Sequence, residues 1–244
     1  MGLSLSCFFP CYNDAATIGD LVQDADAIAR EYTEDYEVIV VDDGSTDRSR
    51  EVLKALKEKV PRLKLVFHDH NRGYGGALQS GFEAATGALV FYTDGDGQYD
   101  AKELRLLLAE FKDDVDAVNG YKIKRSDPLY RVVIGKLYQI GMRIAFGLKI
   151  RDVDCDFRLI RKAALERISL SHTSGVICVE LVKKLERAGA RFVEVPVHHY
   201  PRMHGQSQFF RVRRLFRVGV NLVRLWVEVM LKEDVRHGMQ KEDL

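Results

Sequence analysis

The sequence has few cysteines, and none is placed for a metal site or a redox motif. The four are Cys7, Cys11, Cys155 and Cys178; no two have CxxC spacing, and no histidines cluster with them. This pattern gives no support for a structural zinc site. We therefore expect reduced, mostly structural thiols in a reducing compartment.

Long apolar runs and a strong charge imbalance are also absent. No stretch of about 18 uninterrupted apolar residues occurs, so no transmembrane helix is predicted. No basic segment followed by an apolar one opens the chain, so no signal peptide is predicted. The net charge is only +1 over 244 residues, which gives no reason to expect a nucleic-acid partner. No linker rich in proline or serine divides the chain, and we expect one catalytic domain (1–208) followed by an amphipathic helix and tail (209–244).

Over the first two-thirds of the chain, apolar runs typical of strands alternate with segments of helical spacing. Pro10 is expected to end the first strand, and Ser45 to cap the second helix. The alternation predicts an α/β fold, with a mainly parallel, twisted, Rossmann-like sheet and helices on both faces. Ligands of such sheets bind beyond the carboxyl ends of the strands. The expected strands are 3–9, 37–41, 63–67, 88–93, 117–119 and 192–197, the expected helices are 15–30, 45–59, 75–85, 101–111, 129–146, 175–188 and 209–231, and a polar loop is expected at 151–158.

Two carboxylates follow the expected fourth strand. Asp94 and Asp96 are separated by Gly95, which allows a tight turn, and Gly97 and Gln98 follow. Hard cations such as Mg²⁺ and Mn²⁺ prefer oxygen ligands, typically one or two carboxylates with phosphate oxygens. The alternative is a solvated acidic turn, because Asp and Gly are common turn residues. The position directly after an apolar strand favours a divalent-cation site.

A second acidic pair follows the expected second strand. Asp42 or Asp43 can accept hydrogen bonds from a nucleobase or a ribose hydroxyl, next to a helix N-terminus that favours negative groups. For Ser45 and Asp47 we expect a capping role instead.

Two further segments leave binding and structural roles open. The glycine-rich run 71–77 matches neither the dinucleotide nor the P-loop fingerprint, so it is either a phosphate loop or a packing turn. Lys122, Arg125 and Arg131 follow the fifth strand. They either hold phosphate oxygens or form a solvated basic loop.

The C-terminal stretch is basic and aromatic. No acidic residue occurs from Pro201 to Val227, whereas six arginines alternate with Phe209, Phe210, Phe216 and Trp226. A helix of this composition suits contact with a membrane surface, because anionic headgroups attract arginine while aromatic rings enter the acyl boundary. The alternative is a helix packed on the protein body or in a dimer.

Six ordered motifs together resemble the family 2 glycosyltransferases, and within them the polyprenyl-phosphate (dolichyl-phosphate mannose synthase-like) enzymes. The resemblance covers roughly residues 4–210, and its motifs are 10–14, 42–47, 71–77 with Gly81, 94–98, 152–158, and 194–197 followed by Arg202, Gly205 and Ser207. The chain carries Asp14, Lys122, Gly135, Asp156 and Gln208 where the family pattern has Glu, Arg, Ser, Gly and Lys.

The resemblance implies a single A-type nucleotide-sugar transferase domain with C-terminal amphipathic helices. It implies that Asp94, Asp96 and Gln98 bind Mg²⁺ or Mn²⁺, and that Arg131 joins the two aspartates in catalysis. The residues that it implies for binding the donor are Pro10, Tyr12, Asp14, Val41, Asp42, Asp43, Gly95, Lys122 and Arg202.

We therefore expect inverting transfer of a sugar from a GDP- or UDP-sugar to a dolichyl- or undecaprenyl-type phosphate, in cell-envelope glycan biosynthesis. The enzyme is expected in the cytoplasm, peripheral on the cytoplasmic face of a membrane, and a homodimer or a separate membrane subunit stays open. One alternative is transfer to a hydroxyl of a cell-surface glycan or lipid, with Asp152, Asp154 or Asp156 as base. Another is a nucleotide-binding scaffold without catalysis.

Overall fold

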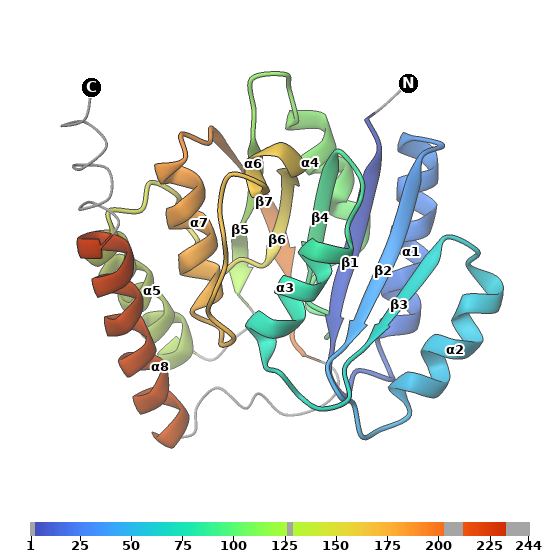
Figure 1. Cartoon of the computed structure of the whole chain (residues 1–244), viewed down its shortest axis with the longest axis horizontal. Helices are drawn as coiled ribbons and strands as arrows, with labels where there is room; N and C mark the ends of the chain where they lie inside the picture. The colour runs from blue at the N-terminus through green and yellow to red at the C-terminus, as the bar shows by residue number, and fades with distance from the viewer. Residues whose placement is uncertain (1–2, 126–128, 203–211, 233–244) are drawn as a thin grey trace.

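A single seven-stranded sheet organises the chain, and the computed structural model describes residues 3–125, 129–202 and 212–232 (Figure 1). The strand order is β3-β2-β1-β4-β6-β5-β7, and every pair is parallel except those that β6 makes with β4 and β5. The predicted α/β class with a mainly parallel sheet is confirmed. The strands are β1 (Leu5–Cys11), β2 (Tyr36–Asp42), β3 (Leu63–Phe67), β4 (Leu89–Thr93), β5 (Ala117–Arg125), β6 (Phe157–Arg161) and β7 (Phe192–His199).

Helices cover both faces of this sheet. One face packs against α1 (Ile18–Tyr32), α2 (Ser49–Lys59) and the pair η1 (Ala101–Glu103) and α4 (Leu104–Glu110). The other face packs against α3 (Tyr74–Ala84), α6 (Lys162–Leu165) and α7 (Ile177–Arg187). Beyond α7, at one side of the molecule, lie α5 (Leu129–Phe146), α8 (Val212–Trp226) and the π-helical turn η2 (Val227–Lys232) (Figure 1).

Strand β1 runs through the centre of the core. All seven of its residues are buried, because helices cover both faces, which explains its unbroken apolar sequence. On the α3 side, the Phe8 ring contacts the Phe82 ring edge-on at 5.0 Å and stacks on Tyr92 at 5.4 Å between ring centroids. A separate apolar cluster joins Val179 and Val182 of α7 to Leu225 of α8. The C-terminal helix is therefore packed on the protein body along one of its faces.

Two local expectations were wrong. Strand β1 continues through Pro10 to Cys11, and this is tolerated because β4 pairs with β1 only as far as Phe8, so no neighbour on that side needs the missing N–H. Ser45 does not cap α2, which begins at Ser49. The Ser49 N–H instead donates to Asp47 Oδ1 at 2.9 Å, while Ser45 Oγ accepts the Asn13 N–H at 3.0 Å.

The segment expected to be a polar loop at 151–158 ends in a strand that the sequence analysis missed. Strand β6 begins at Phe157 and fills the gap between β4 and β5, running opposite to both. Its five residues include two arginines, so the apolar run is too short to stand out. Strand β5 is also longer than expected, because β7 as well as β6 pairs with it.

The C-terminal part of the chain bears on two further expectations. Among the described residues, no helix combines the length and apolarity needed to cross a membrane. The predicted domain boundary at 208 and the aromatic pair Phe209 and Phe210 lie outside the described residues. That boundary stays a prediction.

Two helical glycines provide a matched test of this packing. A Cβ at Gly81 of α3 would lie 2.3 Å from the Phe8 ring, whereas a Cβ at Gly141 of α5 meets nothing within 4 Å. We predict that Gly81→Ala lowers the free energy of unfolding by about 1–3 kcal/mol, because the core is overpacked. Gly141→Ala should instead raise it by up to about 1 kcal/mol through helix propensity. Urea unfolding of both variants checks this, and equal effects would contradict the packing.

Candidate functional site

The loops that follow β1 and β4 are locked together at the carboxyl edge of the sheet. Thr17 Oγ1 donates to the Gly95 carbonyl at 2.7 Å, and a Cβ at Gly95 would lie only 2.6 Å from the Pro10 carbonyl oxygen. Gly97 has a φ of +75°, in the region that favours glycine. The two glycines therefore let the aspartates between and beside them sit directly against the end of β1.

Asp94 and Asp96 lie in this turn and have different partners. Tyr74 Oη donates to Asp94 Oδ1 at 2.7 Å. Asp96 Oδ1 accepts the Gln98 N–H at 3.0 Å, and its Oδ2 pairs with Arg202. Burial, followed by the neighbouring charges of Asp156 and Asp96, raises the pKa of Asp94 well above its ordinary value. This crowding of negative charge, on oxygen donors at a strand end, fits a hard divalent cation.

Gln98 connects the aspartates to the segment that follows β7. Its side-chain Nε2 donates to the Tyr200 carbonyl at 3.1 Å, and the Tyr200 N–H donates to the Gln98 carbonyl at 2.8 Å. These two bonds place Arg202, two residues further on, beside Asp96. The structure thus brings Asp94, Asp96, Gln98 and Arg202 together, while coordination of a metal by Asp94, Asp96 and Gln98 stays a prediction.

The residues predicted to surround the nucleoside lie at the adjacent ends of β1 and β2 and in the loop after β1. Pro10 and Val41 are buried in the sheet, whereas Tyr12 is 42% exposed. The Tyr12 N–H donates to Asp14 Oδ2 at 3.0 Å. Burial raises the pKa of Asp14 to about 6, and the charge of Asp96 adds to the shift.

The acidic pair after β2 is bound largely by the protein itself. Asp43 accepts the N–H groups of Arg72 at 2.7 Å and Gly73 at 3.0 Å, and its Oδ1 lies 2.7 Å from His68 Nδ1. Asp42 Oδ1 accepts from Arg50 Nε at 2.6 Å, while its Oδ2 is buried and has no hydrogen-bond partner within the described part of the chain. Asp43 is therefore held by protein groups and Asp42 is fully buried, and their predicted contacts with the nucleoside stay predictions.

The glycine-rich run 71–77 favours the packing alternative. Gly73 has a φ of +86°, and a Cβ there would lie 2.6 Å from the Thr173 carbonyl oxygen. A Cβ at Gly75 would lie 2.2 Å from the His172 carbonyl oxygen. The glycines thus let the start of α3 rest on the backbone of the loop before α7.

The basic residues after β5 are placed unequally. Lys122 Nζ donates to the Asp154 carbonyl at 2.7 Å. Its positive charge lowers the pKa of Asp94, against the larger effects of burial and of the neighbouring carboxylates. Arg125 ends β5 and Arg131 lies in the first turns of α5, but both side chains fall outside the described residues. Their predicted contacts with phosphate stay predictions.

A buried cation beneath the site was missed by the sequence analysis. Arg158 is 1% exposed; its Nε donates to Asn119 Oδ1 at 2.5 Å, and its other nitrogens donate to Tyr92 Oη and the Val153 carbonyl. Its Nη1 also lies 3.3 Å from Asp156 Oδ1. Arg158 therefore holds the 152–156 loop and balances part of its negative charge. A charged residue inside the apolar run of β6 was the available signal.

The aspartates at positions 152, 154 and 156 of this loop differ in their hydrogen-bond partners. Both oxygens of Asp152 accept protein hydrogen bonds, from Gln139 Nε2 at 2.6 Å and the Lys122 N–H at 3.3 Å. Asp156 Oδ1 accepts from Cys178 Sγ at 3.1 Å. Burial raises the pKa of Asp154 to about 7, against the opposing charge of Lys122.

The raised pKa of Asp154 predicts a pH effect on stability. Its carboxyl holds a proton in the folded protein that the unfolded chain releases, so stability falls as the pH rises from about 4 to about 7. Asp154→Asn should match the wild type at pH 4 and exceed it by about 2–4 kcal/mol at pH 8. Chemical unfolding at both pH values measures this, with the exposed Asp113→Asn as control. A constant difference across the pH range would contradict the assignment.

The sequence matches one family model and a set of curated enzymes. Residues 6–169 match the family model described as glycosyl transferase family 2. An undecaprenyl-phosphate 4-deoxy-4-formamido-L-arabinose transferase of Yersinia enterocolitica is 28% identical over 207 residues, which are 84% of this chain and 62% of that protein. The same enzyme of Pseudomonas aeruginosa is 28% identical over 212 residues, 86% of this chain and 62% of its own length. The chain thus spans less than two-thirds of these curated relatives.

Two solved structures show the same fold at low sequence identity. Glucosyl-3-phosphoglycerate synthase of Mycobacterium tuberculosis, in complex with Mn²⁺, uridine diphosphate and glucosyl-3-phosphoglycerate, has a TM-score of 0.70 and 17% identity over 93% of this chain and 80% of that one. A mannosyltransferase of Pyrobaculum calidifontis, in complex with GDP-mannose and Mn²⁺, has a TM-score of 0.64 and 21% identity over 95% of this chain and 71% of that one.

Proposed function

This chain belongs to glycosyl transferase family 2, and we propose that it transfers a sugar from a nucleoside-diphosphate sugar to a polyprenyl phosphate with the help of a divalent cation. The observation that carries the proposal is the cluster of Asp94 and Asp96 with Arg202 beside them and Lys122 acting on Asp94. The curated relatives, named for transfer to undecaprenyl phosphate, support the class of acceptor. The solved neighbours that hold UDP or GDP-mannose with Mn²⁺ support the class of donor and the metal.

The roles of the chain's own residues follow from charge. Asp94 and Asp96 would hold Mg²⁺ or Mn²⁺, which when bound supplies positive charge against the leaving diphosphate. Arg202 and Lys122 add fixed positive charges beside the two aspartates. They would stabilise the negative charge that develops on the diphosphate as its bond to the anomeric carbon breaks. The acceptor phosphate is already ionised, so its oxygen forms the new bond without a strong base. Displacement from the opposite side inverts the anomeric centre.

Removal of either aspartate tests the metal assignment. We predict that Asp94→Ala and Asp96→Ala each lower turnover at least about 100-fold, because the charge on the leaving diphosphate is no longer offset. Purified protein is assayed with a panel of UDP- and GDP-sugars, polyprenyl phosphate and Mn²⁺, with Asp113→Ala as an exposed control. A thermal-shift screen of nucleoside diphosphates with and without Mn²⁺ identifies the base. Near-normal turnover by both variants would refute the proposed site.

A hydroxyl acceptor is the second candidate, and one observation favours it. A hydroxyl needs a base, and the pKa of Asp154, raised to about 7, suits a base at neutral pH. The same assay separates the two acceptors, since lipid alcohols replace polyprenyl phosphate in a parallel arm. Nucleotide binding without turnover in either arm would instead indicate a scaffold that has lost catalysis.

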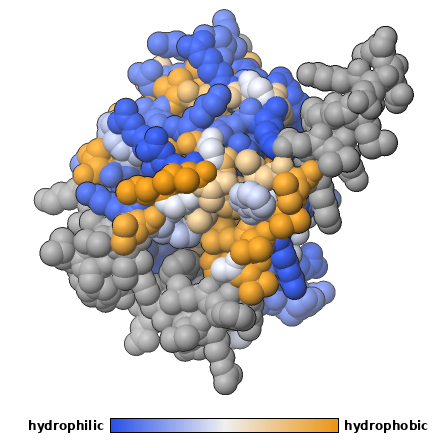
Figure 2. Space-filling model, turned by 90° about the vertical axis from the view of Figure 1, so that its left-hand side faces the viewer, coloured by the Kyte–Doolittle hydropathy of each residue, from blue (hydrophilic) through white to orange (hydrophobic). Residues whose placement is uncertain are grey.

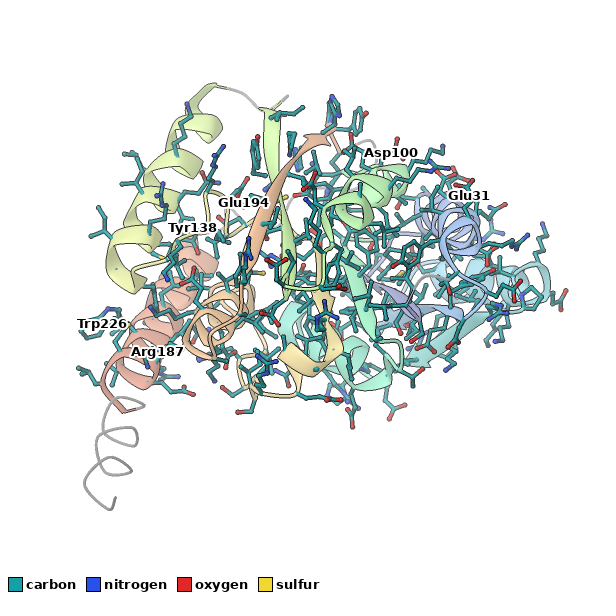
Figure 3. All side chains as sticks on the ribbon, turned by 90° about the horizontal axis from the view of Figure 1, so that it is seen from above. Glu31, Asp100, Tyr138, Arg187, Glu194 and Trp226 are labelled. Carbon is teal, nitrogen blue, oxygen red and sulfur yellow. The ribbon has the colours of Figure 1, made fainter. Side chains whose placement is uncertain are left out.

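We further propose that the enzyme lies on a membrane surface, at a face built by α5 and α8 together. Trp226 of α8 donates its indole N–H to the Ala145 carbonyl of α5 at 2.7 Å, which joins the two helices (Figure 3). Figure 2 shows apolar residues gathered on this side of the molecule. The helices contain no acidic residue within 129–146 or 212–226. Within the described parts of the two helices, the large apolar side chains that are exposed are Leu137, Ile140, Ile144, Val220, Val223 and Trp226.

Apolar side chains flanked by basic ones suit the headgroup region of an anionic bilayer. Lys136, Arg143 and Arg224 are exposed on these helices. This arrangement brings a lipid-linked acceptor to the protein by surface binding. It supports a peripheral location on the cytoplasmic face, where nucleotide sugars would be supplied.

Charge placed in this face tests the membrane proposal. We predict that the double variant Ile144→Glu/Val223→Glu lowers binding to anionic vesicles at least about 10-fold, because two exposed apolar anchors, 78% and 64% exposed, become charged. Flotation with phosphatidylglycerol-containing vesicles measures binding at low and high salt. Leu106→Glu, at an apolar side chain 44% exposed on α4, is the matched control. Equal binding by wild type and double variant would contradict the proposal.

A further inference from the structure

The phenol of Tyr74 is the protein's own partner of the metal-binding Asp94. Its Oη donates to Asp94 Oδ1 at 2.7 Å, from the first residue of α3. A hydrogen bond from the protein fixes the orientation of a metal-ligating carboxylate, and removing such a partner typically weakens metal binding. The position of Tyr74 therefore sets how Asp94 is presented.

Tyr74 is itself held by the loop 171–174, which precedes α7. The glycines on either side of it, Gly73 and Gly75, touch the backbone of Thr173 and His172 so closely that no Cβ fits. The Gly75 N–H donates to the Thr173 carbonyl at 2.9 Å. Gln79, one turn further along α3, donates to the His172 carbonyl at 3.0 Å. The start of α3 is thus fixed to the backbone of this loop by two hydrogen bonds and close packing.

The loop is anchored to α7 by a buried carboxylate. Glu180 is fully buried and accepts from the Ser171 N–H at 3.0 Å and the His172 N–H at 3.0 Å. Lys184 Nζ, one turn away, donates to Glu180 Oε1 at 2.8 Å and to the Ser169 carbonyl at 2.9 Å. These bonds fix the loop at its α7 end.

The C-terminal helix α8 and the turn η2 also contact the loop 171–174. Glu228, in the π-helical turn η2, lies 3.5 Å from His172 Nε2 and 3.7 Å from Lys184 Nζ. Asn221 of α8 donates to Ser174 Oγ at 3.3 Å. His172, Glu180 and Glu228 meet here, and the Lys184 ammonium already pairs with the Glu180 carboxylate. We therefore interpret the cluster as a structural contact between the helix and the loop, and not as a cation site.

We propose that Tyr74 is a positioning residue for Asp94, and that the loop 171–174 couples it to the seating of the C-terminal helix. The route runs from Glu228 and Asn221 through the loop to the start of α3, and from Tyr74 to the metal site. It rests on the proposed function, in which Asp94 binds the cation. In this arrangement the helix face that meets the membrane is linked to the affinity of the metal site.

Metal titration, without any acceptor, tests this directly. Mn²⁺ is titrated calorimetrically into protein saturated with UDP and, in parallel, with GDP. Tyr74→Phe, which removes only the hydroxyl, should weaken Mn²⁺ binding about 10-fold. The control Tyr36→Phe removes the same kind of hydrogen bond, from Tyr36 Oη to Asp26 Oδ1 at 3.0 Å. Tyr36 lies at the amino end of β2, away from the site, so this variant should change the Mn²⁺ affinity by less than about two-fold.

A double-mutant cycle tests the coupling. Glu228→Gln, with Asn221→Ala as a second variant, should weaken Mn²⁺ binding about three-fold in the wild-type background and add nothing in the Tyr74→Phe background. Glu31→Gln, which breaks the exposed pair with Arg105, is the control. Unchanged binding by Tyr74→Phe overturns the positioning role, and additive effects overturn the coupling. Absence of any Mn²⁺-dependent nucleotide binding by the wild type overturns the proposed function as well.

Discussion

The concentration of negative charge at the end of β4 is the constraint on which the rest of the site depends. Burial raises the pKa of Asp94, and the neighbouring charges of Asp156 and Asp96 add to the shift. Arg158 balances this charge from inside the core, while Lys122 and Arg202 act from β5 and from the segment after β7. A divalent cation held at the proposed site would add further positive charge.

Close backbone approach is what allows this concentration. Gly95 rests against the carbonyl of Pro10, and Gly73 and Gly75 rest against the loop before α7. A side chain at any of these glycines would clash with the neighbouring backbone and force the elements apart. The aspartates, the end of β1 and the start of α3 can then share one small volume, and Tyr74 can reach Asp94.

The C-terminal helix was expected either to contact a membrane or to pack on the protein body, and its structure is compatible with both roles. One face packs on α7 through Leu225 and Val229, as expected of a helix on the protein body. The same helix contacts α5 through Trp226 and leaves the Val223 side chain exposed, which suits the proposed contact with a membrane. A helix anchored on one side and exposed on the other is suited to transmit its seating to the body, and the loop 171–174 lies directly under it.

The sequence alone determined the alternation of strands and helices, because burial on two faces imposes apolar runs that local reading detects. It also singled out Asp94 and Asp96 as a candidate cation pair, because ligands of such sheets bind beyond the carboxyl ends of the strands. It missed β6, whose core position depends on neighbours 60 residues away, and it read Pro10 and Ser45 by local rules that pairing and long-range hydrogen bonds overrode. Only tertiary structure assigned Asp43 to the 71–77 loop, Arg158 to the core and Tyr74 to Asp94. Partners distant in the sequence leave no local pattern, since their contacts exist only once the chain has folded.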